Sequence, residues 1–108
     1  MERLNYIPER GDLIGLNLNP TLGHEQKGYR PNLVITNKKF NKIHHRMITC
    51  PVTHTVRSHP LEVEIKTPTV KGVILPDQVR TVDWTARKLK FLGHASPETL
   101  RDVCDKLE

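Results

Sequence analysis

The apolar residues of this chain fall in short runs at two-residue spacing, and turn-forming residues separate the runs. The clearest run is 61–66, where apolar and charged side chains alternate strictly. Comparable runs occupy residues 12–18, 32–37, 47–52, 70–75, 78–82 and 88–92, and the first of these reads as a half-buried strand. Turns recur about every 8 to 12 residues. The pattern predicts a small barrel or a tightly curled sheet of short strands.

The period of the apolar pattern changes near the C-terminus. There the apolar residues follow helical spacing, at Leu100, Val103, Cys104 and Leu107. Ser96 is a suitable N-cap, and Pro97 suits the first helical position. We therefore expect a mainly β protein closed by a C-terminal amphipathic helix. Because no repeat or linker interrupts the pattern, we expect a single domain over residues 1–108.

The charge balance restricts the class of partner. A formal net charge of +5 favours a polyanion, either nucleic acid or an acidic protein segment. No apolar stretch approaches the roughly 18 residues of a membrane-spanning helix, and the N-terminal residues lack an apolar signal segment. Cys50 and Cys104 form no metal or redox motif, so we expect reduced, core-filling cysteines in a cytoplasmic protein.

Residues 20–31, PTLGHEQKGYRP, gather polar chemistry between two apolar runs. Two glycines and two prolines exclude a helix or a central strand here, so we expect a loop. The loop offers a carboxylate that can accept a proton, cations that can bind a phosphate and a ring that can stack on a base: Glu25, Lys27, Arg30 and Tyr29. A solvated loop whose charges only maintain solubility has the same composition.

Two other strand ends carry polar groups that could join this loop. They contain Thr53, His54, Arg57 and His59 after the third apolar run, and Gln78 and Arg80 at a later junction. Loops at one end of a barrel often carry function because the scaffold holds them in place, so these groups could form an anion site. A single histidine is more often structural than catalytic, and spacing alone leaves the convergence open.

Two motifs give the chain a family resemblance. Residues 11–14 read GDLI and residues 19–31 read NPTLGHEQKGYRP, which resembles the signature of the MazF/PemK toxins at nearly every fixed position. Matches continue through residues 50–53, 72–73 and 77–80 to the C-terminal helix, and so cover almost the whole chain. The resemblance implies an SH3-like barrel with extra helices that forms a homodimer. It also implies an mRNA interferase, which cuts single-stranded RNA at short specific sequences without ribosome, metal or other cofactor.

The resemblance assigns roles to individual residues. Arg30 and Thr53 match the family's catalytic arginine and threonine. Glu25 matches the loop glutamate, and Gln78 a position that contacts substrate. The remaining expected substrate contacts are Lys27, Tyr29, His54 and Arg80.

Our hypothesis for the chemistry is attack of a ribose 2′-hydroxyl on the adjacent phosphate. Arg30 would stabilise the developing charge, and Thr53 would hydrogen-bond a non-bridging oxygen. Glu25 is a better-matched base than arginine, which holds its proton too firmly, and His54 is the candidate acid. We expect His24 and His59 to be surface residues, and Trp84 to pack at a barrel edge or dimer seam rather than stack on RNA.

Departures from the family pattern lie close to the loop. Gly15 stands where many members have an aromatic residue, and Asn17 and Asn19 stand where many have aspartate. These changes bear on the RNA sequence that is cut more than on the chemistry.

The resemblance further implies a cognate antitoxin, MazE-like, whose acidic C-terminal tail occupies the RNA-binding groove. Two alternative functions stay open at this point. One is a non-catalytic toxin of the same barrel that poisons a protein such as DNA gyrase, as CcdB-like relatives do. The other is an SH3-like RNA-binding module without chemistry.

Overall fold

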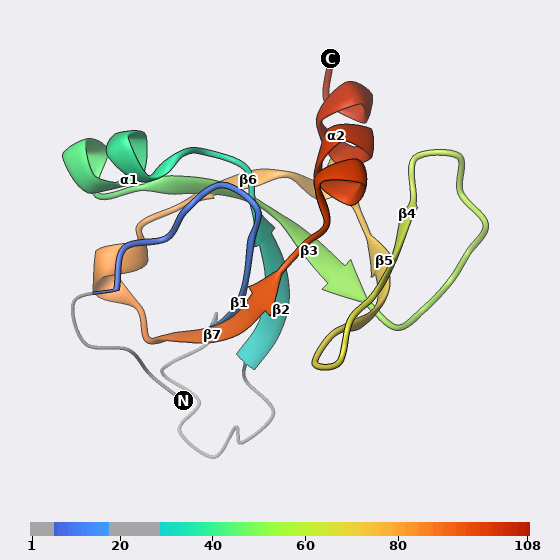
Figure 1. Cartoon of the computed structure of the whole chain (residues 1–108), viewed down its shortest axis with the longest axis horizontal. Coiled ribbons are helices and arrows are strands. Elements are labelled where there is room, and N and C mark those ends of the chain that lie inside the picture. Colours follow the sequence, from blue (N-terminus) through green and yellow to red (C-terminus); the bar gives the residue numbers. More distant parts are fainter. Residues whose placement is uncertain (1–5, 18–28) are drawn as a thin grey trace.

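The computed structural model describes residues 6–17 and 29–108. Its centre is a strongly curled antiparallel sheet in the order β4-β5-β3-β2-β1-β7, with β6 paired to β3 (Figure 1). The strands are β1 (Asp12–Asn17), β2 (Tyr29–Val34), β3 (Met47–Thr53), β4 (Val63–Lys66), β5 (Lys71–Ile74), β6 (Arg80–Val82) and β7 (Leu89–His94). The helical elements are α1 (Lys38–His44), α2 (Pro97–Lys106) and the single turns η2 (Pro76–Gln78) and η3 (Trp84–Ala86).

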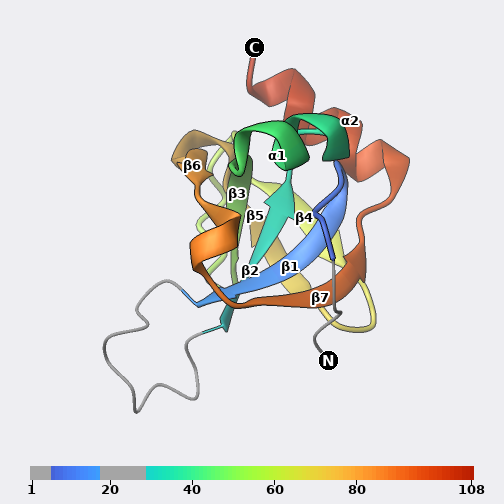
Figure 2. The ribbon, with the colours of Figure 1, turned by 90° about the vertical axis from the view of Figure 1, so that its left-hand side faces the viewer.

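Strand β3 makes the sheet curl, because it pairs with three different strands along its length. Its first residues pair with β6, its middle with β2, and Val52 and Thr53 at its end with β5. The expected mainly β fold, a small barrel-like sheet with a C-terminal helix, is confirmed. Both α-helices lie toward the same end of the sheet (Figure 2).

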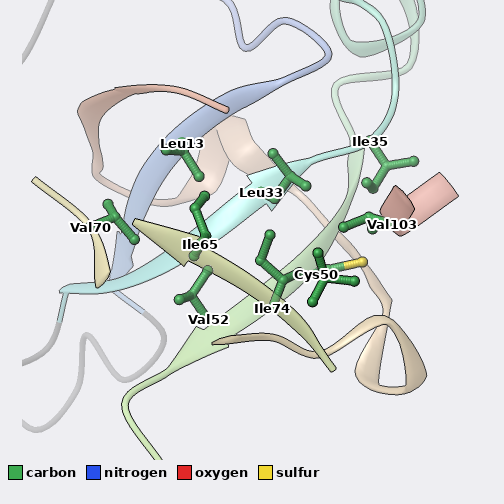
Figure 3. Packing of buried hydrophobic residues seen from close by; sticks show 10 residues of the cluster. Leu13, Leu33, Ile35, Cys50, Val52, Ile65, Val70, Ile74 and Val103 are labelled. Carbon is green, nitrogen blue, oxygen red and sulfur yellow. The ribbon is translucent and has the colours of Figure 1, made fainter. Parts of the chain in front are cut away.

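The core consists of two apolar clusters on opposite faces of the sheet. The larger one collects Leu33, Cys50 and Ile74 with Val103 of α2 (Figure 3). Leu13 belongs to this cluster, whereas Ile14 and Leu16 belong to the second one. The prediction of a half-buried strand at 12–18 is therefore wrong, because core covers β1 on both of its faces.

The C-terminal helix follows its sequence signals. The Ser96 hydroxyl accepts a hydrogen bond from the Thr99 amide at 3.1 Å, and Pro97 begins the helix. Val103 is fully buried, and the other stripe residues pack against the larger cluster: Leu100, Cys104 and Leu107. The predicted helix is confirmed.

Helix α1 was not expected from the sequence, because it lacks an apolar stripe. Its two large apolar residues, Phe40 and Ile43, are exposed, and its buried residue is Asn41. The Asn37 side chain caps the helix by accepting from the Phe40 amide at 2.8 Å. A local capping signal thus decides the start of this helix.

Strand β2 begins earlier than the composition suggests. Residues 29–31, expected in the loop, pair with residues 15–17 of β1, and β2 ends at Val34 rather than at residue 37. Conversely, β4 begins at Val63, so Leu61 and Glu62 belong to the preceding loop. Strand pairing overrides the local turn signals here.

In the described part of the chain, no helix is long and apolar enough to cross a membrane.

Candidate functional site

The open end of β3 borders a pocket of about 300 Å³. Its walls come from β2, from β3 and the loop after it, and from the turn at η2. The polar side chains that line it include Arg30, Thr53, Arg57, His59, Asp77 and Gln78. Of the predicted site residues, the structure thus brings Arg30, Thr53 and Gln78 together.

A buried polar pair holds the strand that carries Arg30. The Asn32 side chain is fully buried; its amide donates to the Arg30 carbonyl at 3.1 Å, and its oxygen accepts from the Thr49 hydroxyl at 3.1 Å. These bonds fix the backbone of β2 at Arg30 against β3. Sequence reasoning missed Asn32 and Thr49, because a polar residue inside an apolar run gives no sign of whether its partner is solvent or protein.

The Thr53 hydroxyl has a proton that it can donate in a hydrogen bond to a ligand. Its oxygen accepts a hydrogen bond from the Thr55 amide at 3.2 Å, in a local turn at the end of β3. A hydroxyl has one proton and two lone pairs, so the proton of Thr53 is left for another acceptor. A phosphate oxygen in the pocket would be such an acceptor.

The loop between β3 and β4 is closed by its own hydrogen bonds. The Glu62 carboxylate accepts from the Arg57 amide at 3.0 Å, and the Glu62 amide donates to the His59 carbonyl at 3.0 Å. Ser58 adopts a positive φ of 56° within this turn. Glu62, expected on the solvent side of a strand over 61–66, lines the pocket instead, because β4 begins only at Val63.

Gln78 reaches the pocket from a turn that is fastened to β3. The Leu75 amide donates to the Pro51 carbonyl at 2.9 Å, and the Gln78 amide donates to the Leu75 carbonyl at 3.1 Å. Pro76 begins this single helical turn, and Asp77 follows it into the pocket wall. These bonds hold the turn against the strand that ends in Thr53.

The other predicted site residues lie elsewhere. Tyr29 precedes Arg30 in a strand, so its side chain is on the opposite face, where the Lys90 ammonium is 5.8 Å from the ring centroid. A Cβ at Gly15 would lie 3.3 Å from that of Tyr29, so the missing side chain makes room for this ring. His54 and Arg80 are exposed and do not line the pocket. Glu25 and Lys27 lie outside the described residues.

Two further groups bear on what the site can do. Burial, together with the smaller effects of Cys104 and Asp77, raises the pKa of the Cys50 thiol from 9.0 to about 12, so Cys50 stays a neutral core residue. Both cysteines are free thiols, as predicted.

Trp84 packs against the second cluster and donates from Nε1 to the Asn41 carbonyl at 2.9 Å. In residues 6–17 and 29–108 no three ligand-type side chains gather as they would around a metal ion.

Comparison with known proteins decides the family. The model of the family described as PemK-like, MazF-like toxin of type II toxin–antitoxin system matches residues 9–108. The chain belongs to this family. The toxin resemblance read from the two motifs is thereby confirmed.

Individual relatives in the PemK-like, MazF-like family agree with this assignment. The endoribonuclease toxin MazF of Escherichia coli is 34% identical over 102 residues, which cover 94% of this chain and 92% of that protein. MazF of Deinococcus radiodurans (form I) has a TM-score of 0.83 at 38% identity, covering 95% of this chain and 94% of that one. A MazE–MazF structure from the same organism (form II) has a TM-score of 0.84 at 34% identity, covering 95% and 93%.

Proposed function

We propose that this chain is the toxin of a type II toxin–antitoxin pair and an endoribonuclease that cuts single-stranded RNA at a short specific sequence. The observation that carries the proposal is the meeting of Arg30, from β2, and Thr53, from β3, at one pocket. The family match over residues 9–108 and the endoribonuclease relatives support it. We treat residues 1–108 as one toxin domain that acts in the cytoplasm, where its RNA substrate is found.

The proposed reaction is transphosphorylation within the RNA strand. The 2′-oxygen of a ribose forms a bond to the adjacent phosphorus, and the bond from phosphorus to the 5′-oxygen breaks. The 2′-hydroxyl proton passes to Glu25, and the leaving 5′-oxygen takes a proton from water. The products are a 2′,3′-cyclic phosphate and a 5′-hydroxyl. The proposed reaction uses no metal ion or cofactor.

The pocket residues act on the charge that develops at the phosphate. The Arg30 guanidinium can bind two phosphate oxygens with its planar fork of donors. The Thr53 hydroxyl donates its remaining proton to a non-bridging oxygen, and Gln78 contacts the neighbouring nucleotide. A preorganised donor of this kind contributes about 2.7–4 kcal/mol to transition-state stabilisation.

The proposed partner is a cognate antitoxin with an acidic C-terminal tail. The chain carries a formal net charge of +5, and Arg30, Arg57 and His59 line the pocket that such a tail would cover. We propose that the toxin acts as a homodimer with the antitoxin tail in its RNA groove.

Adding an acidic antitoxin peptide tests this part of the proposal. We expect the peptide to raise the melting temperature and abolish cleavage together. Loss of cleavage without a complex on a sizing column would contradict the competition. Light scattering of the free toxin tests the dimer, and a monomer that cleaves at full rate would rule it out.

End-group mapping of cleaved RNA tests the reaction. We expect each cut to leave a 2′,3′-cyclic phosphate and a 5′-hydroxyl, with the cuts confined to one short sequence. A 5′-phosphate product would contradict the proposed attack by the 2′-hydroxyl. A folded, antitoxin-free protein that leaves RNA intact would favour the gyrase poison or the RNA-binding module.

A further inference from the structure

His59 lies in the pocket wall, in the loop between β3 and β4. It reaches the pocket that Arg30 and Thr53 share, from the loop that directly follows Thr53. The sequence pattern groups it with His54 as a candidate for the anion site and does not distinguish the two. The pocket lining and the hydrogen bonds of His59 do distinguish them.

One edge of the His59 ring is already engaged. The Leu61 amide donates to His59 Nδ1 at 3.1 Å. Because Pro60 has no N–H, Leu61 carries the first amide after His59 that can make this bond. The Glu62 amide donates to the His59 carbonyl at 3.0 Å, so the turn holds both the backbone and the ring.

This engagement fixes the position of the ring proton. A nitrogen that accepts a hydrogen bond carries no proton, and a neutral imidazole has its single proton on the other nitrogen. The neutral ring of His59 is therefore protonated at Nε2. With Nδ1 turned to the Leu61 amide, the opposite edge of the ring, which carries the Nε2 proton, remains for a ligand.

We propose that His59 is a further catalytic residue, whose neutral imidazole donates a hydrogen bond from Nε2 to a non-bridging oxygen of the RNA phosphate. This inference rests on the proposed function, since it places His59 beside Arg30 and Thr53 as a third donor around the same phosphate. The other charged side chains of the pocket are Arg57, Glu62 and Asp77.

The hydrogen-bond pattern also disfavours two other roles for this ring, because each would break the bond from the Leu61 amide. As a base, His59 would need a free lone pair on Nε2, which is the protonated nitrogen. As an acid, it would need a second proton on Nδ1, and the Leu61 amide occupies that site. A neutral donor is the role that leaves the turn intact.

Two matched variants separate the donor from the turn. In His59→Asn the side-chain oxygen can still accept from the Leu61 amide, but the donor no longer reaches the position of Nε2. In His59→Gln the amide nitrogen can occupy the position of Nε2, but the acceptor at Nδ1 is lost. We expect His59→Asn to lower kcat about 10- to 100-fold with little change in KM, and His59→Gln to stay within a few-fold of the parent.

Cleavage of one single-stranded RNA by the parent and both variants is the test. Activity of His59→Asn equal to the parent, or an equal loss in both variants, would overturn the proposal, since neither result depends on a donor at Nε2. If the parent itself does not cleave, the proposed function fails first and this inference fails with it.

The tautomer gives a readout that does not need RNA. Nitrogen-15 spectra of the imidazole in the parent protein should show the proton on Nε2 and a lone pair on Nδ1. A ring protonated at Nδ1 in its neutral form would overturn the proposal whatever the cleavage rates are.

Discussion

Substitution of Gly72 by alanine tests whether RNA cleavage depends on the position of the end of β3. Gly72 lies on β5 with a φ of +147°, in the region that side chains rarely adopt. A Cβ built there would lie 2.2 Å from the Thr53 carbonyl oxygen, well below the 3.0 Å that real Cβ contacts respect. The overlapped atom belongs to the backbone of Thr53, the proposed catalytic threonine. A backbone atom cannot avoid the overlap by a change of rotamer, as the end of a side chain could.

The size of the effect follows from that overlap. Thr53 and Gly72 must separate by most of an ångström, and misplacing a reacting group by about 1 Å costs about 100-fold in rate. The positive φ adds strain of about 1–3 kcal/mol, so the free energy of unfolding should fall by about 3 kcal/mol or more. We expect Gly72→Ala to remain folded at low temperature with kcat reduced about 100-fold.

Gly93 supplies the matched control. It also has a positive φ, +130°, but a Cβ there meets only the Thr69 hydroxyl, at an ordinary 3.7 Å. Gly93→Ala should therefore lose about 1–3 kcal/mol of stability and keep kcat within a few-fold of the parent. Urea unfolding and RNA cleavage of both variants are the assays. Equal cleavage by the two variants would refute the claim that the Gly72 contact places Thr53.

Two stability predictions follow from buried polar groups. The folded-state pKa of Cys50, about 12, lies above its ordinary 9.0, so its stabilising effect should be complete below pH 9 and be lost as the pH rises toward 12. The difference in unfolding free energy between the parent and Cys50→Ala should shrink over that range, and a constant difference would contradict a buried neutral thiol. Asn41 is fully buried and donates to the carbonyls of Pro8 and Thr36 at 2.8 and 3.0 Å, so Asn41→Ala should cost about 3 kcal/mol in urea unfolding. The exposed cap variant Asn37→Ala should cost about 1 kcal/mol, and equal losses would show that the buried bonds contribute little.

Strict alternation and helical spacing were sufficient to predict β4 and α2. Residues 63–66 alternate between buried and exposed as their apolar and charged side chains do, and Ser96 caps α2 as its position suggests. The start of β2 was not readable, because glycine and proline around Tyr29 indicate a turn, and only pairing with β1 draws residues 29–31 into a strand. Helix α1 has no apolar stripe at all.

The site shows the same division between local pattern and tertiary placement. The resemblance pointed to Arg30, Thr53 and Gln78, and these three do line one pocket. His59 was grouped with His54 and Arg57 as a candidate for the anion site but received no role, because what distinguishes it is the hydrogen bond from the Leu61 amide, which only a folded turn creates. His54, next to Thr53 in sequence, looked better placed but does not line the pocket.

Cleavage of a long single-stranded RNA by the purified toxin in EDTA, with end-group mapping, tests the central claim most directly. Arg30→Ala and Thr53→Ala are measured beside the parent, with melting temperatures to show that all three are folded. We predict that the parent cuts at one short sequence and leaves 2′,3′-cyclic phosphates, and that both variants lose at least about 100-fold in kcat. Cutting by either variant at the parent rate, or no cutting by a folded parent, would contradict the account.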